Sequence, residues 1–221
     1  MQTERIAITE IRKTRQGRFA LFCENGFLFS LDSETFFTRS IGEGMALAPA
    51  ELEELRAASE TRKAADKALQ YLSLRDYASG ELYQKLCTRF DEPSAAAAVA
   101  KAADLGLLND GQFARHRARY LLERHKSRRE IARHLAQKGI DRETAEAVLE
   151  ELFQPAQPDG PGPEAAAALA LLRKSYARKL AEGRRDAVLA ALARRGFSYA
   201  AVREALEWYG EELAEAAEAE E

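Results

Sequence analysis

The sequence predicts a mainly α-helical protein built from tandem three-helix repeats, with a small β region at its N-terminus. Its composition supports the helices, because alanine supplies much of an apolar share of 46% and only 8% of the residues are aromatic. Apolar positions of equivalent helices also recur after about 50 residues, which is typical of arrays that bury their faces by stacking neighbouring units.

The first forty residues carry the β pattern. The segments RFALFCE and FLFSLDS alternate apolar and other residues with period two, and Asn25-Gly26 lies between them. Asn-Gly suits a type I′ hairpin turn, in which both central residues need a positive φ. An earlier strand is predicted over Arg5–Ile11, before a break at Gln16-Gly17. We expect these strands to form one small sheet.

Six of the ten phenylalanines lie before residue 40. One interpretation is a set of rings that stack on bases across an OB-type surface. Three or four short strands are too few for a five-stranded barrel, however. We therefore expect the phenylalanines to form the core of the small sheet.

Helices follow almost without interruption after Gly42 and Gly44. Pro49 is well placed in the first turn of a connecting helix. The later helices form three groups, predicted at 62–75, 80–89 and 94–105; at 110–125, 128–138 and 142–153; and at 164–181, 184–195 and 199–213.

The middle helices of the three groups align with one another. Ile131 and Leu135 match Val188 and Leu192 at an offset of 57 residues, and a similar offset of 49 relates them to the first group. Gly139 follows the last helical residue, and Gly196 does so in the next group, where a left-handed residue is favoured. Ser127 is predicted to start its helix with a capping box that includes Glu130.

These patterns divide the chain into segments. We predict a β region at 1–45, a connecting helix at 46–60, three-helix repeats at 61–108, 109–153 and 164–213, a Pro/Gly-rich spacer at 154–163 and an acidic tail at 214–221. Four of the six prolines lie in the spacer, so it cannot be helical, and the tail is expected to leave the last helix.

Charge is strongly segregated, although the net charge is only −3. Residues 112–138 hold nine Lys or Arg against two acids, and residues 169–195 hold eight against two. Residues 204–221 hold eight acids and neither Lys nor Arg. A partner therefore meets two basic stretches and one acidic stretch, and the small net charge argues against a protein that coats bare DNA.

The sequence shows no chemistry that requires an enzyme. It lacks a phosphate loop, a dinucleotide fingerprint and a nucleophile elbow. His116, His125 and His134 are nine residues apart, which turns neighbours to opposite helix faces, so we expect solvated histidines and no metal site. Cys23 and Cys87 fit two reduced thiols in a cytosolic protein. With no membrane-length apolar run or signal peptide, we expect a cytoplasmic protein without catalytic, metal or cofactor sites.

The helix from Phe113 has an aromatic and arginine strip at the edge of its apolar face. Phe113, Arg117, Tyr120 and Arg124 lie within about 60° of one another on a helical wheel. Such a strip could stack on bases or grip a protein. Alternatively, the rings belong to the core edge and the arginines extend along it. We favour that for the aromatics, but an excess of seven positive charges exceeds what solubility requires.

Three blocks of sequence resemble the RecX family, regulators of the RecA recombinase. They read ALQYLSLRDYASGELYQKL, LGLLNDGQFARHRA and KSRREIARHLAQKGID, and NGFLFSLDSETFFTRSIGEGMAL resembles a β extension of Gram-positive members. The likeness covers residues 5–152 well and 164–209 more weakly. The sequence departs from the family where Asp76-Tyr77-Ala78 follows Arg75, and where Asn109-Asp110 replaces Asp-Asp.

The resemblance implies an elongated, curved array of three-helix repeats that lies in the groove of the RecA–single-stranded DNA filament. It implies a monomer without catalytic activity that inhibits strand exchange, ATP hydrolysis and coprotease activity, and so regulates DNA repair and the SOS response. The candidate contacts to RecA or phosphates are Arg115, Arg119, Arg128, Arg129, Arg133, Arg184, Arg185, Arg194 and Arg195. A general nucleic-acid binder and a helical adaptor for another protein remain alternatives.

Overall fold

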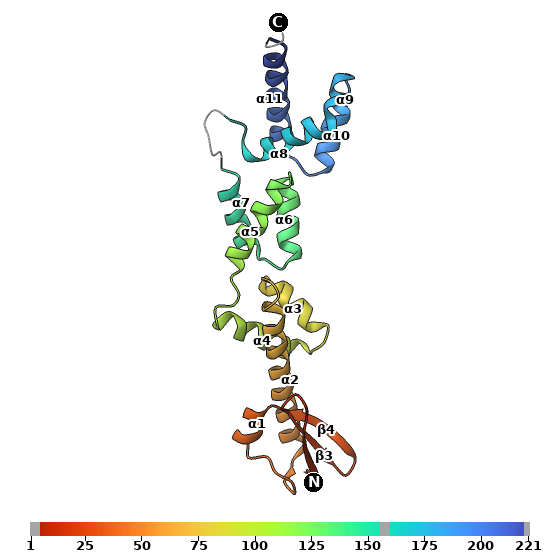
Figure 1. Cartoon of the computed structure of the whole chain (residues 1–221), viewed down its shortest axis with the longest axis vertical. Helices are drawn as coiled ribbons and strands as arrows, with labels where there is room; N and C mark the ends of the chain where they lie inside the picture. Colours follow the sequence, from red (N-terminus) through yellow and green to blue (C-terminus); the bar gives the residue numbers. More distant parts are fainter. Residues whose placement is uncertain (1–4, 155–159, 219–221) are drawn as a thin grey trace. The chain divides into compact units, whose positions relative to one another are not determined.

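The computed structural model describes residues 5–154 and 160–218, which form two compact units (Figure 1). The first unit comprises residues 1–77 and 82–108, and the second comprises 78–81 and 109–221. The predicted fold class, mainly α-helical with a small N-terminal β region, is confirmed. The curvature of the array stays a prediction. Among the described helices, none combines the length and apolarity that crossing a bilayer requires.

The first unit contains the β region and the first helices. Its elements are β1 (Ile6–Ala7), β2 (Glu10–Lys13), β3 (Phe19–Cys23), β4 (Gly26–Leu31), α1 (Ser33–Thr38), β5 (Ala46–Leu47), α2 (Pro49–Leu72), most of α3 (Ser79–Cys87) and α4 (Glu92–Asp104). Strands β2, β3 and β4 form one antiparallel sheet, and β1 pairs with β5. The single strand predicted over Arg5–Ile11 is therefore wrong: the segment contributes to both sheets.

The hairpin between β3 and β4 differs from the predicted type I′ turn. Cys23 pairs with Gly26, so Glu24 and Asn25 form the two-residue connection. Gly26 has a φ of +110°, but Asn25 does not have a positive φ. A register shift after Leu21 changes which residues face each other, and the loop moves with it.

The phenylalanines of the β region are only partly core residues. Phe29 is buried with Ile8, Leu21 and Leu31. Phe27 is 62% exposed and Phe37 is 67% exposed, which corrects the prediction that all six form the core. Because the described strands form a three-stranded sheet and a separate short pair, they do not make a five-stranded barrel.

Helix α2 runs without a break from Pro49 to Leu72, so the predicted division between a connecting helix and the first helix of the first repeat is wrong. The predicted break fell on a segment with no proline or glycine. Ser59 there is fully buried, and its hydroxyl bonds to the Ser30 carbonyl and accepts from Arg18. These bonds satisfy the one buried polar side chain that could have disturbed the helix.

The second unit contains the remaining helices. They are α5 (Asp110–Glu123), α6 (Arg128–Gln137), α7 (Arg142–Leu152), α8 (Pro163–Leu171), the π-helical turn η1 (Leu172–Tyr176), α9 (Ala177–Ala181), α10 (Arg185–Arg194) and α11 (Tyr199–Glu218). The helix predicted over 164–181 is thus interrupted by η1. The acidic segment was expected to leave the last helix after Leu213, but α11 continues to Glu218. Residues 155–159 of the predicted spacer and 219–221 of the predicted tail lie outside the described residues.

The middle helices of the three predicted groups share their buried positions. Leu82 and Leu86 of α3, Ile131 and Leu135 of α6, and Val188 and Leu192 of α10 are all fully buried. Gly139 and Gly196 follow α6 and α10 with φ values of +76° and +89°, as predicted. The boundaries of the repeats remain a proposal, but their central helices bury equivalent side chains.

The start of α3 belongs to the second unit and touches α5 and the end of α6. The carboxylate of Asp110 accepts a 2.8 Å hydrogen bond from the backbone N–H of Ser79. Lys138 forms a 2.5 Å ion pair with Glu81. A Cβ on Gly80 would lie only 2.6 Å from the Cα of Gly139, so two glycines allow this close backbone approach.

Candidate functional site

Helix α5 presents two of the candidate arginines side by side. Its N-terminus is capped by Asn109, whose side chain accepts from the Gln112 N–H. Ala114 and Ala118 are buried against the second unit's core, which turns Arg115 and Arg119 to solvent one helical turn apart. The result is a pair of exposed guanidinium groups on one face.

The predicted aromatic and arginine strip forms a connected group on the same helix. The Arg117 and Arg124 guanidinium groups lie 5.2 and 4.6 Å from the ring centroid of Tyr120, within cation–π range. Phe113 packs at the edge of the core. Arg117 also donates from Nε to Nε2 of His134 at 2.8 Å. Phe113 therefore lies where the core-edge interpretation expects it, but Tyr120 is 41% exposed and contacts the two arginines instead of the core.

His134 corrects the prediction that all three histidines are solvated. It is half-buried, and it accepts the Arg117 hydrogen bond through an unprotonated nitrogen. Burial lowers the pKa of His134, and the positive charges of Arg117 and Lys138 lower it further, although Glu81 and Glu130 oppose them. Spacing alone could not reveal this partner, because Arg117 lies on another helix.

We expect acidification to destabilise the second unit through His134. Its pKa in the folded chain lies below the ordinary 6.5, so the unfolded chain binds the proton more readily. Above pH 6.5, the ordinary pKa of histidine, the contribution of His134 to the free energy of unfolding is constant. It is lost as the pH falls from that value towards the lower pKa of the folded chain. Urea unfolding from about pH 8 to about pH 5 should show a steeper loss than in His134→Gln, whose amide oxygen accepts without titrating. Equal losses in both proteins would contradict this role.

The start of α6 presents three more candidate arginines. The Ser127 hydroxyl accepts from the Glu130 N–H at 3.2 Å, which confirms the cap. Glu130 pairs with Lys126 at 2.6 Å and does not close the predicted box. Ile131 and Leu135 face the core, so Arg128, Arg129 and Arg133 all lie exposed on the remaining surface.

The end of α10 lies directly against the start of α6. The Ser127 hydroxyl donates to the Arg195 carbonyl at 2.8 Å, across 68 residues of sequence. A Cβ on Gly196 would lie 3.2 Å from the Cβ of Arg129, so that arginine packs against the glycine. The two basic stretches therefore meet here, and we call Arg128, Arg129, Arg133, Arg194 and Arg195 the junction arginines.

A hollow of about 510 Å³ lies beside two of the junction arginines and also carries the carboxylates of Glu146 and Glu164. Arg128 and Arg129 line one side, while Ala132, Leu149 and Phe197 supply apolar walls. Glu164 of α8 holds the elements around it together: it accepts from the Arg128 N–H at 3.1 Å and from the Ser198 hydroxyl at 2.8 Å. Sequence reasoning could not single out Glu164, because its two partners are 36 and 34 residues away.

Arg184 and Arg185 are not brought to the junction. They stand at the start of α10, whereas Arg194 and Arg195 stand at its end. Ten helical residues span about 15 Å, so one helix separates the two pairs of arginines. Arg184 forms a 3.7 Å ion pair with Glu182.

The candidate arginines differ from other arginines of the second unit in their partners. Arg142, Arg178 and Arg203 each pair with a glutamate four residues ahead. Arg173 pairs with Glu212. Within the described ranges, by contrast, eight candidates form no ion pair: Arg115, Arg119, Arg128, Arg129, Arg133, Arg185, Arg194 and Arg195. A partner can bind these arginines without breaking an ion pair within the chain, so only their hydration has to be removed.

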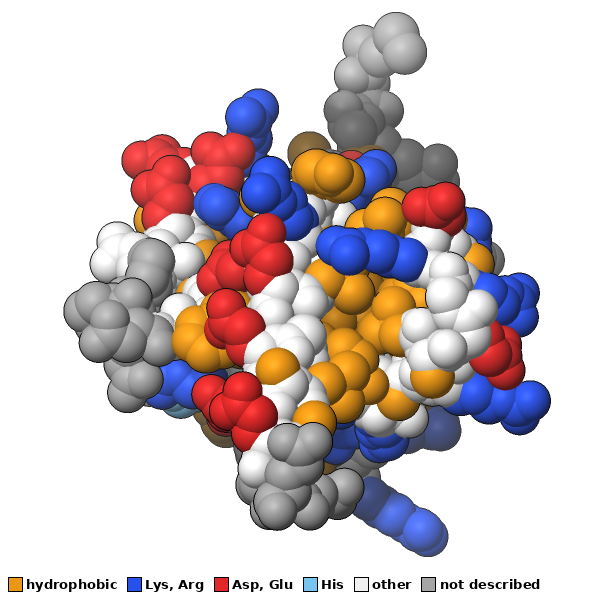
Figure 2. All heavy atoms as spheres, turned by 90° about the horizontal axis from the view of Figure 1, so that it is seen from above, with side chains coloured by type: hydrophobic (Ala, Val, Ile, Leu, Met, Phe, Trp, Pro, Cys, Tyr) orange, Lys and Arg blue, Asp and Glu red, His pale blue; other side chains and the backbone are white. Residues whose placement is uncertain are grey.

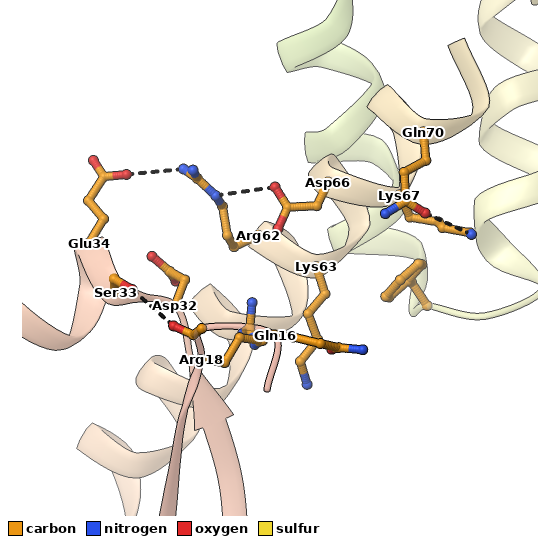
Figure 3. A pocket seen from close by; sticks show the side chains of 12 residues that line it. Gln16, Arg18, Asp32, Ser33, Glu34, Arg62, Lys63, Asp66, Lys67 and Gln70 are labelled. Carbon is orange, nitrogen blue, oxygen red and sulfur yellow. Dashed lines mark hydrogen bonds and ion pairs between the residues drawn. The ribbon is translucent and has the colours of Figure 1, made fainter. Parts of the chain in front are cut away.

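The first unit has a polar cleft of about 690 Å³ between the β2–β3 turn, α1 and α2 (Figure 3). Its charges are already engaged with one another. Arg62 bridges Glu34 and Asp66, as the dashed lines show, and Lys67 donates to Gln70. Lys63 pairs with Glu60, and Arg18 donates to Ser30 and Ser59. This cleft therefore offers a ligand fewer free groups than the junction does.

The described side chains include three histidines and two cysteines. No group of three or more His, Cys, Asp or Glu side chains comes together there in a way that could hold a metal ion. Cys23 and Cys87 are free thiols, both half-buried.

Comparison with known proteins identifies the middle of the second unit. Residues 109–149 match the family model described as RecX, second three-helix domain. This stretch holds α5, α6 and most of α7, and therefore the arginines of both helices.

Curated relatives extend the match. The regulatory protein RecX of Listeria welshimeri is 30% identical over 111 residues, which are 50% of this chain and 41% of that protein. RecX of Lactobacillus gasseri is 31% identical over 110 residues, with 49% and 41% covered. RecX of Caldanaerobacter subterraneus is 27% identical over 144 residues, with 65% and 73% covered. The matches to the first two thus span about two fifths of the relatives' length.

Two solved structures share the fold. A crystal structure of regulatory protein RecX superposes with a TM-score of 0.67 at 22% identity and covers 91% of this chain and 99% of its own. RecX from Lactobacillus salivarius gives 0.58 at 24% identity, with 68% and 96% covered. The family model, the curated relatives and the two structures of the same fold are all RecX proteins, and this chain is similar to that family.

Proposed function

We propose that this chain is a non-enzymatic regulator that binds the RecA–single-stranded DNA filament in the cytoplasm. Binding as a single chain, it inhibits the recombinase and coprotease activities of RecA, and so regulates DNA repair and the SOS response. The named relatives are regulatory RecX proteins, which supports the class of function. Partner contacts fall to the arginines that the second unit leaves unpaired.

The meeting of two basic stretches at one junction carries the proposal. Ser127 and Gly196 bring the start of α6 to the end of α10, so charges from two repeats face one partner. A filament of protein and DNA offers both carboxylates and phosphates, and arginine forms bidentate bonds with either. Arg115 and Arg119 on α5 add a second pair of cations within the same unit.

The test compares two triple variants in RecA ATP hydrolysis on single-stranded DNA. Arg128→Ala, Arg129→Ala and Arg133→Ala together remove three unshared charges at the junction. We expect the concentration for half-inhibition to rise at least about tenfold, because three charged contacts are lost. Thermal unfolding of each variant reports whether the fold is retained.

The matched control is Arg142→Ala, Arg178→Ala and Arg203→Ala. It removes the same charge from exposed helix positions of the same unit, but from arginines that are already paired. This control should inhibit like the parent chain. If both triple variants lose inhibition equally, net charge alone explains the effect. If the junction triple still inhibits fully, the proposed contacts are rejected.

Two alternatives have distinct outcomes. A general nucleic-acid binder would bind naked single strands, and its affinity would fall with salt by about 0.7 log units per neutralised phosphate. Binding to the filament without binding to naked DNA excludes that alternative. A helical adaptor for another protein would leave RecA hydrolysis unchanged at several-fold excess over filament sites.

A further inference from the structure

Two cations that line the polar cleft of the first unit are held by neutral groups alone among the described residues. Arg18 is half-buried, and its guanidinium donates to the hydroxyl and carbonyl of Ser30 and to the hydroxyl of Ser59, which leaves Nη1 without a partner there. Lys67 is half-buried too and donates to the amide oxygen of Gln70 (Figure 3). Because partial burial removes hydration from these charges, an anion beside them would be favourable.

A third cation lies close to Lys67. The ammonium groups of Lys67 and Lys85 each lie 4.9 Å from the ring centroid of the half-buried Tyr71. Lys85 comes from α3 and forms no ion pair within the described ranges. Two like charges near one ring repel each other, so an anion at this end of the cleft would be attracted by both.

The carboxylates of the cleft have partners of their own. Glu34 and Asp66 both pair with Arg62. Asp32 caps α1 and accepts from the backbone N–H and the hydroxyl of Thr35. These acids therefore do not pair with either of the two cations that neutral groups hold.

An aromatic ring lines the same cleft. Phe90 is half-buried beyond the end of α3, and its ring lies in the lining together with Lys67 and Gln70. A nucleotide carries a flat base that stacks on aromatic rings and a phosphate that binds cations. The amide side chains of Gln16 and Gln70, which also line the cleft, have donors and acceptors that suit the edge of a base.

The face of the molecule in Figure 2 suits an anion less well. Acidic side chains follow one another there along one side of an apolar area. A phosphate on that area would be repelled by the acidic row, whereas the acids of the cleft are already partnered. The combination of cations and a ring therefore favours the cleft.

We propose that the cleft of the first unit binds a nucleoside phosphate. The phosphate lies against Arg18 and Lys67, with further attraction from Lys85, and the base lies against the ring of Phe90. A free nucleotide and one nucleotide of a single strand share this chemistry. The site uses no residue of the second unit, so it does not depend on the proposed binding of RecA.

Isothermal titration calorimetry of the full chain with AMP and with ribose 5-phosphate tests both parts of the site. AMP should bind, and ribose 5-phosphate should bind at least about fivefold more weakly, because it has no base to stack. Lys67→Gln with Lys85→Gln should weaken both ligands at least about tenfold by removing two charges. Phe90→Leu should abolish the preference for AMP and leave ribose 5-phosphate unchanged.

The matched control is Lys101→Gln. Lys101 is an exposed lysine on α4 that does not line this cleft and has no ion-pair partner among the described residues. This variant should bind AMP like the parent chain. Thermal unfolding reports whether each variant keeps its fold, and Arg18 is left unchanged because it also holds Ser30 and Ser59 together.

Competition between AMP and a short oligo(dA) strand distinguishes the two sources of the ligand. A site for free nucleotides prefers AMP, since only AMP has a terminal phosphate. A site for one nucleotide of a strand prefers oligo(dA), with an affinity that falls with salt by about 0.7 log units per neutralised phosphate. Either preference supports the proposal. It is overturned if neither ligand binds at millimolar concentration, if the double lysine variant binds AMP like the parent chain, or if AMP keeps its advantage in Phe90→Leu.

Discussion

Replacing Gly80 with alanine is expected to lower the free energy of unfolding of the second unit by about 1–3 kcal/mol. The added Cβ would stand 2.6 Å from the Cα and 2.9 Å from the carbonyl oxygen of Gly139. Both are backbone atoms, so no side chain can turn away, and the start of α3 must move from the end of α6. That movement also strains the bonds of Ser79 to Asp110 and of Glu81 to Lys138.

The sign of this effect distinguishes the contact from ordinary helix propensity. Gly210 lies inside α11 with nothing within 4 Å of its Cβ position. Gly210→Ala should therefore stabilise the chain by up to about 1 kcal/mol, as alanine does in helix interiors. Urea unfolding of both variants, followed by circular dichroism, gives the two free energies. Stabilisation by both alanines would show that the close approach of Gly80 and Gly139 does not exist in solution.

The sequence predicts the parts of this fold that depend on neighbouring residues. Ser127 caps α6 by accepting a hydrogen bond from the backbone N–H of Glu130, the third residue ahead. The buried pairs of α3, α6 and α10 follow from apolar residues four positions apart. Helix starts, ends and inward faces obey local rules, so one chain suffices to place them.

Features that depend on distant contacts escaped the same reasoning. The register of the β3–β4 hairpin depends on a bulge, and propensity does not reveal where a strand takes up an extra residue. Helix α2 continues because Ser59 finds Ser30 in a strand 29 residues earlier. His134 is half-buried because Arg117 approaches from another helix. The residues near each position in the sequence do not indicate these distant partners.

The candidate site has some features that the local sequence predicts and others that depend on distant contacts. An excess of charge indicated which stretches are basic, and the spacing of Arg178 and Glu182 shows a pair that sequence can anticipate. It could not show that Arg173 is occupied by Glu212, 39 residues away. Nor could it show that the end of α10, with Arg194 and Arg195, meets the start of α6. Which arginines are available is thus a property of the fold.

Ser127→Ala is expected to lower the free energy of unfolding of the second unit by about 2–4 kcal/mol, from a lost cap and an unsatisfied, part-buried carbonyl. Ser127 is fully buried, and its hydroxyl both accepts from Glu130 and donates to Arg195. Alanine leaves both backbone groups without a partner. Asp141→Ala is the matched control, since Asp141 caps α7 at an exposed position, and its loss should cost about 1 kcal/mol. Urea unfolding measures both costs.

The same variant separates charge from geometry in the proposed function. Ser127→Ala removes no positive charge, but it releases the end of α10 from the start of α6, so the junction arginines no longer share one fixed arrangement. Inhibition of RecA ATP hydrolysis should therefore weaken at a temperature where the variant is still folded, while Asp141→Ala inhibits like the parent chain. If Ser127→Ala inhibits fully and the junction triple does not, the arginines act through charge alone and their convergence has no role in binding.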